Sequence, residues 1–71
     1  MRTKVNLTMY VLYTEDWFGK KGYLDKDGYV TKKLEDAMFM RSKELVMYEY
    51  DILDNPSVWQ IKEVIINLRV V

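Results

Sequence analysis

The sequence lacks both cysteine and histidine. Without cysteine, no disulfide can stabilise the fold. Without histidine as well, Ser-His-Asp and Cys-His catalysis and almost every zinc, haem or iron–sulfur site are excluded. We therefore predict a protein that is not an enzyme, with no catalytic residue, no metal site and no cofactor.

An excess of charge of either sign is also missing, because eleven Lys and Arg balance eleven Asp and Glu. A net charge of zero argues against nucleic acid as the partner. Hydrophobic residues make up 49% of the chain, which is too many for intrinsic disorder. The 71 residues suffice for a single domain, residues 1–71. A chain this short buries only about 60% of its unfolded surface and is marginally stable alone.

Long apolar runs are absent too. None reaches the roughly 18 residues that a membrane helix needs. The opening Met1-Arg2-Thr3-Lys4 is not followed by a signal-peptide core. We expect a cytosolic protein with no membrane contact.

What is present at the start of the chain is an alternating pattern. One parity is apolar throughout, with Val5, Leu7, Met9, Val11 and Tyr13. The other parity is polar at first and turns apolar at Tyr10 and Leu12. The pattern predicts a strand with one face in the core and with the second half of its other face covered as well.

Residues 9–30 are predicted to form a β-hairpin or meander. In order, we expect a turn at 14–16, Trp17 and Phe18, a loop at 19–22, a short strand at 23–24, a turn at 25–28 and extended residues 29–30. Aspartate and glycine favour the backbone conformations that such turns require.

Residues 32–53 allow two interpretations. One helix over 32–53, capped by Thr31, would place near one face Leu34, Ala37, Met38, Leu45, Tyr48 and Ile52. Alternatively, a short strand at 37–40 precedes a helix from Lys43 to about Leu53. We favour the second, because Ser42 and Glu44 supply a cap and an acid in the first turn. In both cases Pro56 ends the helical region.

Residues 58–71 have the composition of a strand. Trp59 and Ile61 are apolar at odd positions, whereas the apolar residues from Val64 to Val70 include every even position. The switch at Lys62-Glu63 predicts a β-bulge. The alternative is a strand that is buried on both faces from Val64 to Ile66.

The length of this last strand is itself informative. Fourteen residues at roughly 3.3 Å each span about 45 Å, whereas a globule of this size has a radius of gyration of about 11 Å. The strand must therefore bend sharply or project beyond its domain. A projecting apolar edge would pair with another chain, which favours a homodimer or a complex.

Together these patterns predict an α+β fold. We expect a small antiparallel sheet of three to four strands with one helix packed on one face, in the order ββ(β)αβ. The predicted core consists of Val5, Leu7, Met9, Val11, Leu24, Ala37, Phe39, Leu45, Ile52, Trp59, Ile61, Val64 and Ile66.

Two acidic segments are candidates for chemistry. The segment Asp25-Lys26-Asp27-Gly28 has the start of an EF-hand calcium loop, but its two alignments place Leu34 or Tyr23 at a required ligand position. We interpret it as a turn. Glu15-Asp16 beside Trp17 could serve in acid–base chemistry, although so small a domain has little room for a pocket of about 300 Å³.

A lysine–aromatic cluster is the first candidate binding surface. Lysines at 20, 21, 26, 32 and 33 interleave with Trp17, Phe18, Tyr23 and Tyr29. Lys20 and Lys21 beside stacking rings are typical of single-stranded nucleic-acid sites. Acidic residues interrupt the cluster, and it contains no arginine to contact bases. The alternative is a solvated hairpin whose lysines prevent edge-to-edge pairing.

The second candidate surface is the acidic part of the predicted helix. It carries Glu44, Glu49, Asp51 and Asp54. An acidic helix can dock on a basic partner surface, or it can simply face the solvent.

The order of these features resembles a known setting. The segments follow one another as in small uncharacterised proteins of bacteriophages and prophages of Gram-positive bacteria. They are Tyr10-Val11-Leu12-Tyr13, Gly22-Tyr23-Leu24, Thr31 with Leu34-Glu35-Asp36-Ala37, Ser42-Lys43-Glu44-Leu45 and Trp59-Gln60-Ile61-Lys62-Glu63-Val64. The resemblance covers residues 9–66 and implies a hairpin, a third strand, a helix and a final strand. It supplies no catalytic residues. It implies an accessory protein that binds host or defence proteins.

The sequence thus predicts a non-enzymatic protein-binding module, a phage factor that binds or inhibits a bacterial host or defence protein in the host cytosol. The partner could also be a second copy in a homodimer. The alternatives are a nucleic-acid-associated regulator that uses the lysine–aromatic hairpin and a structural homo-oligomer.

Overall fold

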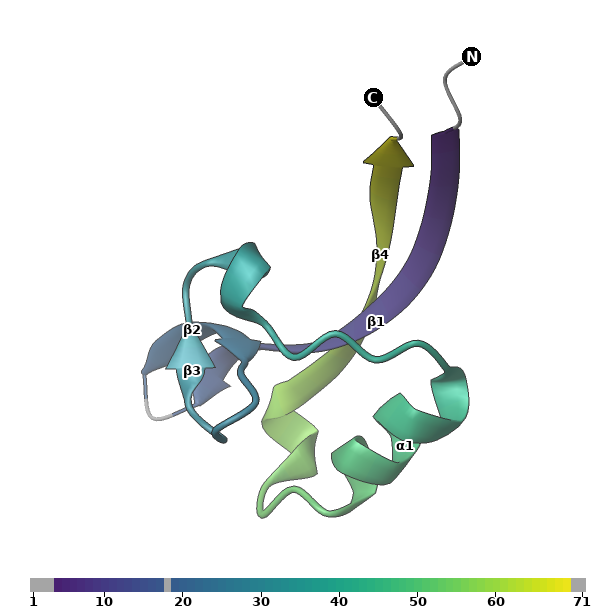
Figure 1. The fold of residues 1–71 in the computed structure, drawn as a ribbon. Helices are drawn as coiled ribbons and strands as arrows, with labels where there is room; N and C mark the ends of the chain where they lie inside the picture. Colours follow the sequence, from purple (N-terminus) through teal and green to yellow (C-terminus); the bar gives the residue numbers. More distant parts are fainter. Residues whose placement is uncertain (1–3, 18, 70–71) are drawn as a thin grey trace.

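The computed structural model describes residues 4–17 and 19–69. Four strands form one antiparallel sheet in the order β3-β2-β1-β4, and one α-helix accompanies it (Figure 1). The strands are β1 (Lys4–Trp17), β2 (Lys20–Leu24), β3 (Val30–Thr31) and β4 (Trp59–Arg69). The helix α1 (Lys43–Asp51) and the short 3-10 helices η1 (Leu34–Asp36) and η2 (Pro56–Val58) lie between β3 and β4 in the chain. The predicted α+β class and element order are confirmed.

The long pair β1–β4 is antiparallel and unbroken. Its register runs from Lys4 opposite Arg69 to Thr14 opposite Trp59. The β-bulge predicted at Lys62-Glu63 is therefore wrong, and so is its alternative, because Ile65 is 66% exposed. Because the register is unbroken, odd and even positions of β4 lie on opposite faces of the sheet. The apolar residues Trp59 and Ile61 therefore lie on one face, and those from Val64 onward at even positions lie on the other.

β1 continues through the turn predicted at 14–16, and that prediction is wrong. Thr14 is fully buried and stands between Trp59 on β4 and Gly22 on β2. Its hydroxyl donates to the Val58 carbonyl oxygen at 2.8 Å, so a polar side chain is satisfied inside the sheet. The register between β1 and β2 shifts between Thr14 and Trp17. The irregular pairing in the sheet is therefore between β1 and β2, not between β1 and β4, where the bulge was predicted.

The predicted loop at 19–22 is also mostly strand, because β2 begins at Lys20. The predicted turn at 25–28 is confirmed. The Asp25 amide donates to the Tyr29 carbonyl at 2.8 Å and the Gly28 amide donates to the Asp25 carbonyl at 3.1 Å. The extended pair that follows is Val30–Thr31, one residue later than predicted.

The split interpretation of residues 32–53 is correct, and the single long helix is wrong. Ser42 caps α1, and its hydroxyl oxygen accepts from the Leu45 amide at 3.2 Å. α1 ends at Asp51, earlier than predicted, with Ile52 as its C-cap residue. The strand predicted at 37–40 amounts to one bridge, in which Met40 and Tyr10 exchange hydrogen bonds of 2.8 and 2.9 Å.

The core lies between α1 and one face of the sheet. Its buried cluster consists of Leu12, Leu24, Met40, Val46 and Trp59. Val11, Leu24, Ala37 and Trp59 are buried as predicted, and six of the predicted core residues are half-buried, namely Leu7, Met9, Phe39, Ile61, Val64 and Ile66. The prediction is wrong for three residues, because Val5 is 43%, Leu45 54% and Ile52 58% exposed. The predicted core omitted Leu12, Met40 and Val46, which are buried. The burial of Leu12 does confirm that the second half of its face of β1 is covered.

The molecule is elongated, with extents of 48 × 24 × 17 Å and a radius of gyration of 13.6 Å. Residues 4–9 of β1 and 64–69 of β4 form a two-stranded ribbon, which we call the arm. The arm extends away from α1, β2 and β3, which gather at the opposite end (Figure 1). The last strand therefore projects beyond the globular end, together with its partner β1.

Candidate functional site

The helix α1 uses one face for the core. Val46 is its buried residue, and Tyr50 and Leu53 pack against the core cluster. These three positions are i, i+4 and i+7, so they share one side of a helix with about 3.6 residues per turn. This face attaches α1 to the sheet.

A second apolar stripe lies on the outside of α1. Leu45, Tyr48 and Ile52 occupy positions i, i+3 and i+7, and Tyr48 is 63% exposed, more than either of the other two. We call these three residues the helix stripe. Single exposed apolar residues are ordinary, but a row of three large ones along one short helix and its C-cap residue Ile52 is a contiguous patch. Leu45 and Ile52 were predicted to lie in the core, and they are exposed on the surface instead.

Carboxylates border the helix stripe on both sides. By helical geometry, Glu44 and Asp51 lie along one side of it and Glu49 along the other. Glu44 and Asp51 are exposed and Glu49 is half-buried. No lysine or arginine occurs from Glu44 to Asp54. Glu44, Glu49 and Asp51 therefore lie together, around an apolar centre that the sequence did not reveal. Asp54, the fourth predicted acidic residue, is exposed beyond the end of α1.

Only some residues of the lysine–aromatic cluster in the hairpin lie close together. The Tyr13 and Tyr23 rings lie 5.2 Å apart at 54°, and the Lys62 ammonium lies 5.8 Å from the Tyr13 ring centre. Lys21 and Lys32 line a hollow beside the two rings. Tyr13 and Lys62 were not predicted, although pairing of β1 with β2 and β4 brings them to this place.

Other predicted members of the hairpin site lie elsewhere. Tyr29 is exposed directly after the 25–28 turn, and Lys20 is exposed at the start of β2. Phe18 and the side chain of Trp17 lie outside the described residues. Glu15 and Glu63 line the hollow that adjoins the Tyr13–Tyr23 pair, so this surface carries both signs of charge.

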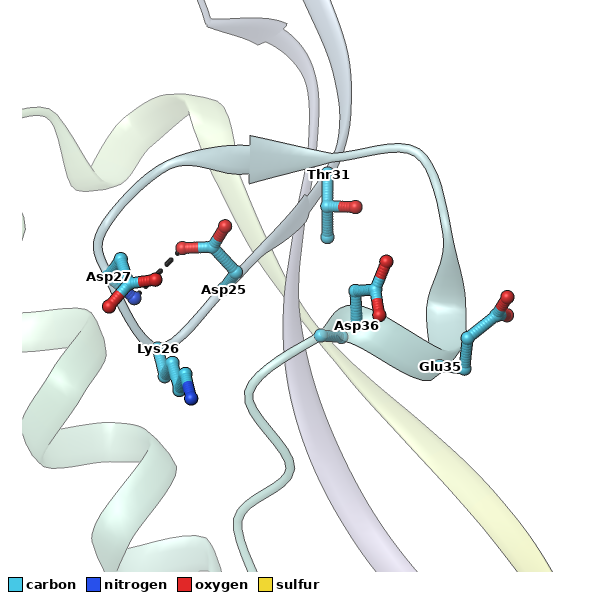
Figure 2. Close-up of a pocket in the computed structure, with 7 residues that line it drawn as sticks. Asp25, Lys26, Asp27, Thr31, Glu35 and Asp36 are labelled. Atoms are coloured by element: carbon cyan, nitrogen blue, oxygen red, sulfur yellow. Dashed lines mark hydrogen bonds between the residues drawn. The ribbon is translucent and has the colours of Figure 1, made fainter.

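A shallow acidic hollow of about 460 Å³ lies between the 25–28 turn and η1 (Figure 2). One Asp25 carboxylate oxygen accepts from the Asp27 and Tyr29 amides, each at 2.9 Å, so this carboxylate holds the turn. Glu35 lies at the far end of the hollow from Asp27 (Figure 2). Within residues 4–17 and 19–69, no group of three or more acidic side chains is arranged to hold a metal ion. The turn interpretation accounts for this segment.

The chain was compared with protein families, with curated proteins and with solved structures, and none of the three comparisons found a match. In the described part of the chain, no helix has the length and apolar character needed to cross a membrane.

Proposed function

We propose that this chain is a non-enzymatic protein-binding module and that the helix stripe is its recognition surface. The partner it fits is a protein with an apolar groove and a basic rim. Amphipathic helices dock in such grooves through residues at i, i+3 and i+7, which are the positions of Leu45, Tyr48 and Ile52.

The exposure of the helix stripe is the observation that carries this proposal. The nine-residue helix buries Val46 and packs Tyr50 against the core, and Leu53 just beyond its end does the same, so large apolar side chains on the outer face contribute little more to stability. Burying one such side chain against a partner is worth about 1.5–3 kcal/mol before the costs of association. An apolar centre with a charged border is also the usual anatomy of a binding hot spot.

The carboxylates determine the chemistry of the partner. Glu44, Glu49 and Asp51 surround the helix stripe without a compensating lysine or arginine between Glu44 and Asp54. Charge complementarity therefore calls for lysine or arginine around the groove, which speeds association and excludes acidic competitors. Nucleic acid would be repelled by the same border.

The biological setting follows from the resemblance to phage and prophage proteins. On that basis the partner is a bacterial host or defence protein of the cytosol, and the chain is a phage accessory factor that inhibits it by occupying the groove.

The test is quantitative capture from bacterial lysate with matched variants. The immobilised chains are the wild type, the stripe variant Leu45→Lys/Ile52→Lys and a control, Lys26→Ala, at the 25–28 turn. We expect a protein that the wild type and the control retain equally and that the stripe variant loses at least tenfold. The captured protein, once purified, should bind with an affinity that falls as salt rises.

Two results would contradict the proposal. One is capture that does not change with the stripe variant. The other is recovery of nucleic acid that the variant Lys21→Glu abolishes and the stripe variant leaves unchanged, because that result assigns binding to the lysine–aromatic hairpin.

A further inference from the structure

The arm is a second surface without a partner in the described chain. β4 is an edge strand of the sheet, with β1 on one side and no described strand on the other. On the other edge of the arm, pairing of β1 with the rest of the chain ends at the Tyr10–Met40 bridge. A two-stranded ribbon in water is marginally stable, and an exposed edge strand is a template for pairing.

One face of the arm is apolar along its whole length. Residues that are opposite in the register share a face, so this face carries Val5, Leu7, Met9, Val64, Ile66 and Leu68. It is the face opposite to the one that carries Leu12, Trp59 and Ile61 in the core. Val5 and Leu68, nearest the far end, are exposed.

We propose that the partner of this edge is a second copy of the chain. The two β4 strands pair antiparallel about a two-fold axis at Ile66, which joins the arms into a four-stranded sheet in the order β1-β4-β4-β1. Three or more strands with an apolar face meet the condition for a stable sheet that one arm does not meet. The inference does not depend on the helix stripe.

The positions of the charged and apolar residues on β4 select this register. With Ile66 opposite the partner's Ile66, Val64 stands opposite the partner's Leu68, so the apolar faces of both arms are continuous. Arg69 stands opposite the partner's Glu63, and this ion pair occurs twice by symmetry. A pairing made from identical strands is therefore complementary in charge.

The neighbouring registers lose these contacts. Moving the pairing by one residue sets Arg69 opposite the partner's Lys62 or Val64. It also places the apolar side chains of one arm on the same side of the sheet as the polar side chains of the other arm. Moving it by two residues sets Arg69 opposite the partner's Ile61 or Ile65. Each of these registers separates Arg69 from the partner's Glu63.

The two charges do not meet within one chain. Glu63 and Arg69 are six residues apart on the same strand, about 20 Å, and their neighbours on β1 are Tyr10 and Lys4. The paired stretch 63–69 also lies beyond Trp59 and Ile61, the part of β4 that packs in the core. Changes of these two charges therefore act between copies and leave the core intact.

Sedimentation equilibrium of the full chain with charge-reversal variants tests the proposal. We expect the wild type to dimerise, and Arg69→Glu and Glu63→Arg each to raise the dissociation constant about tenfold or more, since each variant sets two like-charge pairs across the dyad. The double variant, and an equimolar mixture of the two single variants, should regain the wild-type constant because opposite charges meet again.

A wild-type chain that stays monomeric at millimolar concentration would overturn the inference. So would a dimer that both single variants leave unchanged, or a dimer that Leu45→Lys/Ile52→Lys dissolves. Because the charge variants leave the helix stripe untouched, loss of the dimer and loss of partner capture are separate results.

Discussion

Gly22 shows how one residue positions the whole β2–β3 end of the sheet. Its φ of 153° lies in the region that side chains disfavour, and a Cβ at this position would collide with the Thr31 carbonyl oxygen and lie 3.0 Å from Val30 Cγ1. The absence of a side chain therefore lets β3 pair closely with β2. The sequence suggested a permissive loop at this glycine, because a glycine in a strand and a glycine in a loop leave the same local pattern.

Replacing Gly22 should consequently cost more than replacing a glycine of a turn. We expect Gly22→Ala to lower the free energy of unfolding by about 2 kcal/mol or more, measured by urea denaturation. The control is Gly28→Ala, which has a φ of 86° and open space around the new Cβ, and which should cost about 1 kcal/mol. Equal losses in the two variants would show that the close approach of Thr31 has no energetic role.

Among the elements, α1 shows which structural features the sequence pattern predicts and which it does not. Its start was predictable, because the capping effect of Ser42 does not depend on the rest of the fold. Its end was not predicted by Pro56, because α1 stops at Asp51 and Pro56 begins η2. Its inward face was not predictable. Leu45, Val46 and Met47 are consecutive, so apolar residues surround the helix and their period does not indicate which of them meets the sheet.

The same limit applies to the arm and to the site. The length of the last strand predicted that it bends sharply or projects, and the alternation showed which positions of each strand are apolar. Only the register shows that β1 projects with β4 and that their apolar positions share one face. The acidic residues of the site were identified from composition. Leu45 and Ile52 of its apolar centre were assigned to the core, because the pattern of a buried apolar face and that of an exposed one are the same.

Adjacent residues of α1 should therefore differ in their contribution to stability. We expect Val46→Ala to cost about 1–3 kcal/mol, since it leaves a cavity in the core, and Leu45→Ala to change the free energy of unfolding by less than about 0.5 kcal/mol. Thermal or urea unfolding of the two variants measures both. A larger loss for Leu45→Ala than for Val46→Ala would place the helix stripe in the core and remove it as a recognition surface.

At the scale of the whole molecule, two surfaces lie apart. The globular end fixes α1 so that the helix stripe faces outward, and the arm extends from the other end of the molecule (Figure 1). A net charge of zero conceals this arrangement, since the acids border the helix stripe while lysines gather at the β2–β3 end. We propose the first of these surfaces for a partner protein and the second for another copy of the chain.

Site-specific photo-crosslinking in bacterial cells can test whether the helix stripe contacts the partner. A photoreactive residue replaces Tyr48 in one variant and, as the matched control, Tyr29 in another, whose side chain is 69% exposed but lies at a turn. We expect position 48 to crosslink to one protein, at an apolar groove bordered by lysine or arginine, and position 29 not to crosslink to it. Crosslinking of that protein from position 29 and not from position 48 would contradict recognition through the helix stripe.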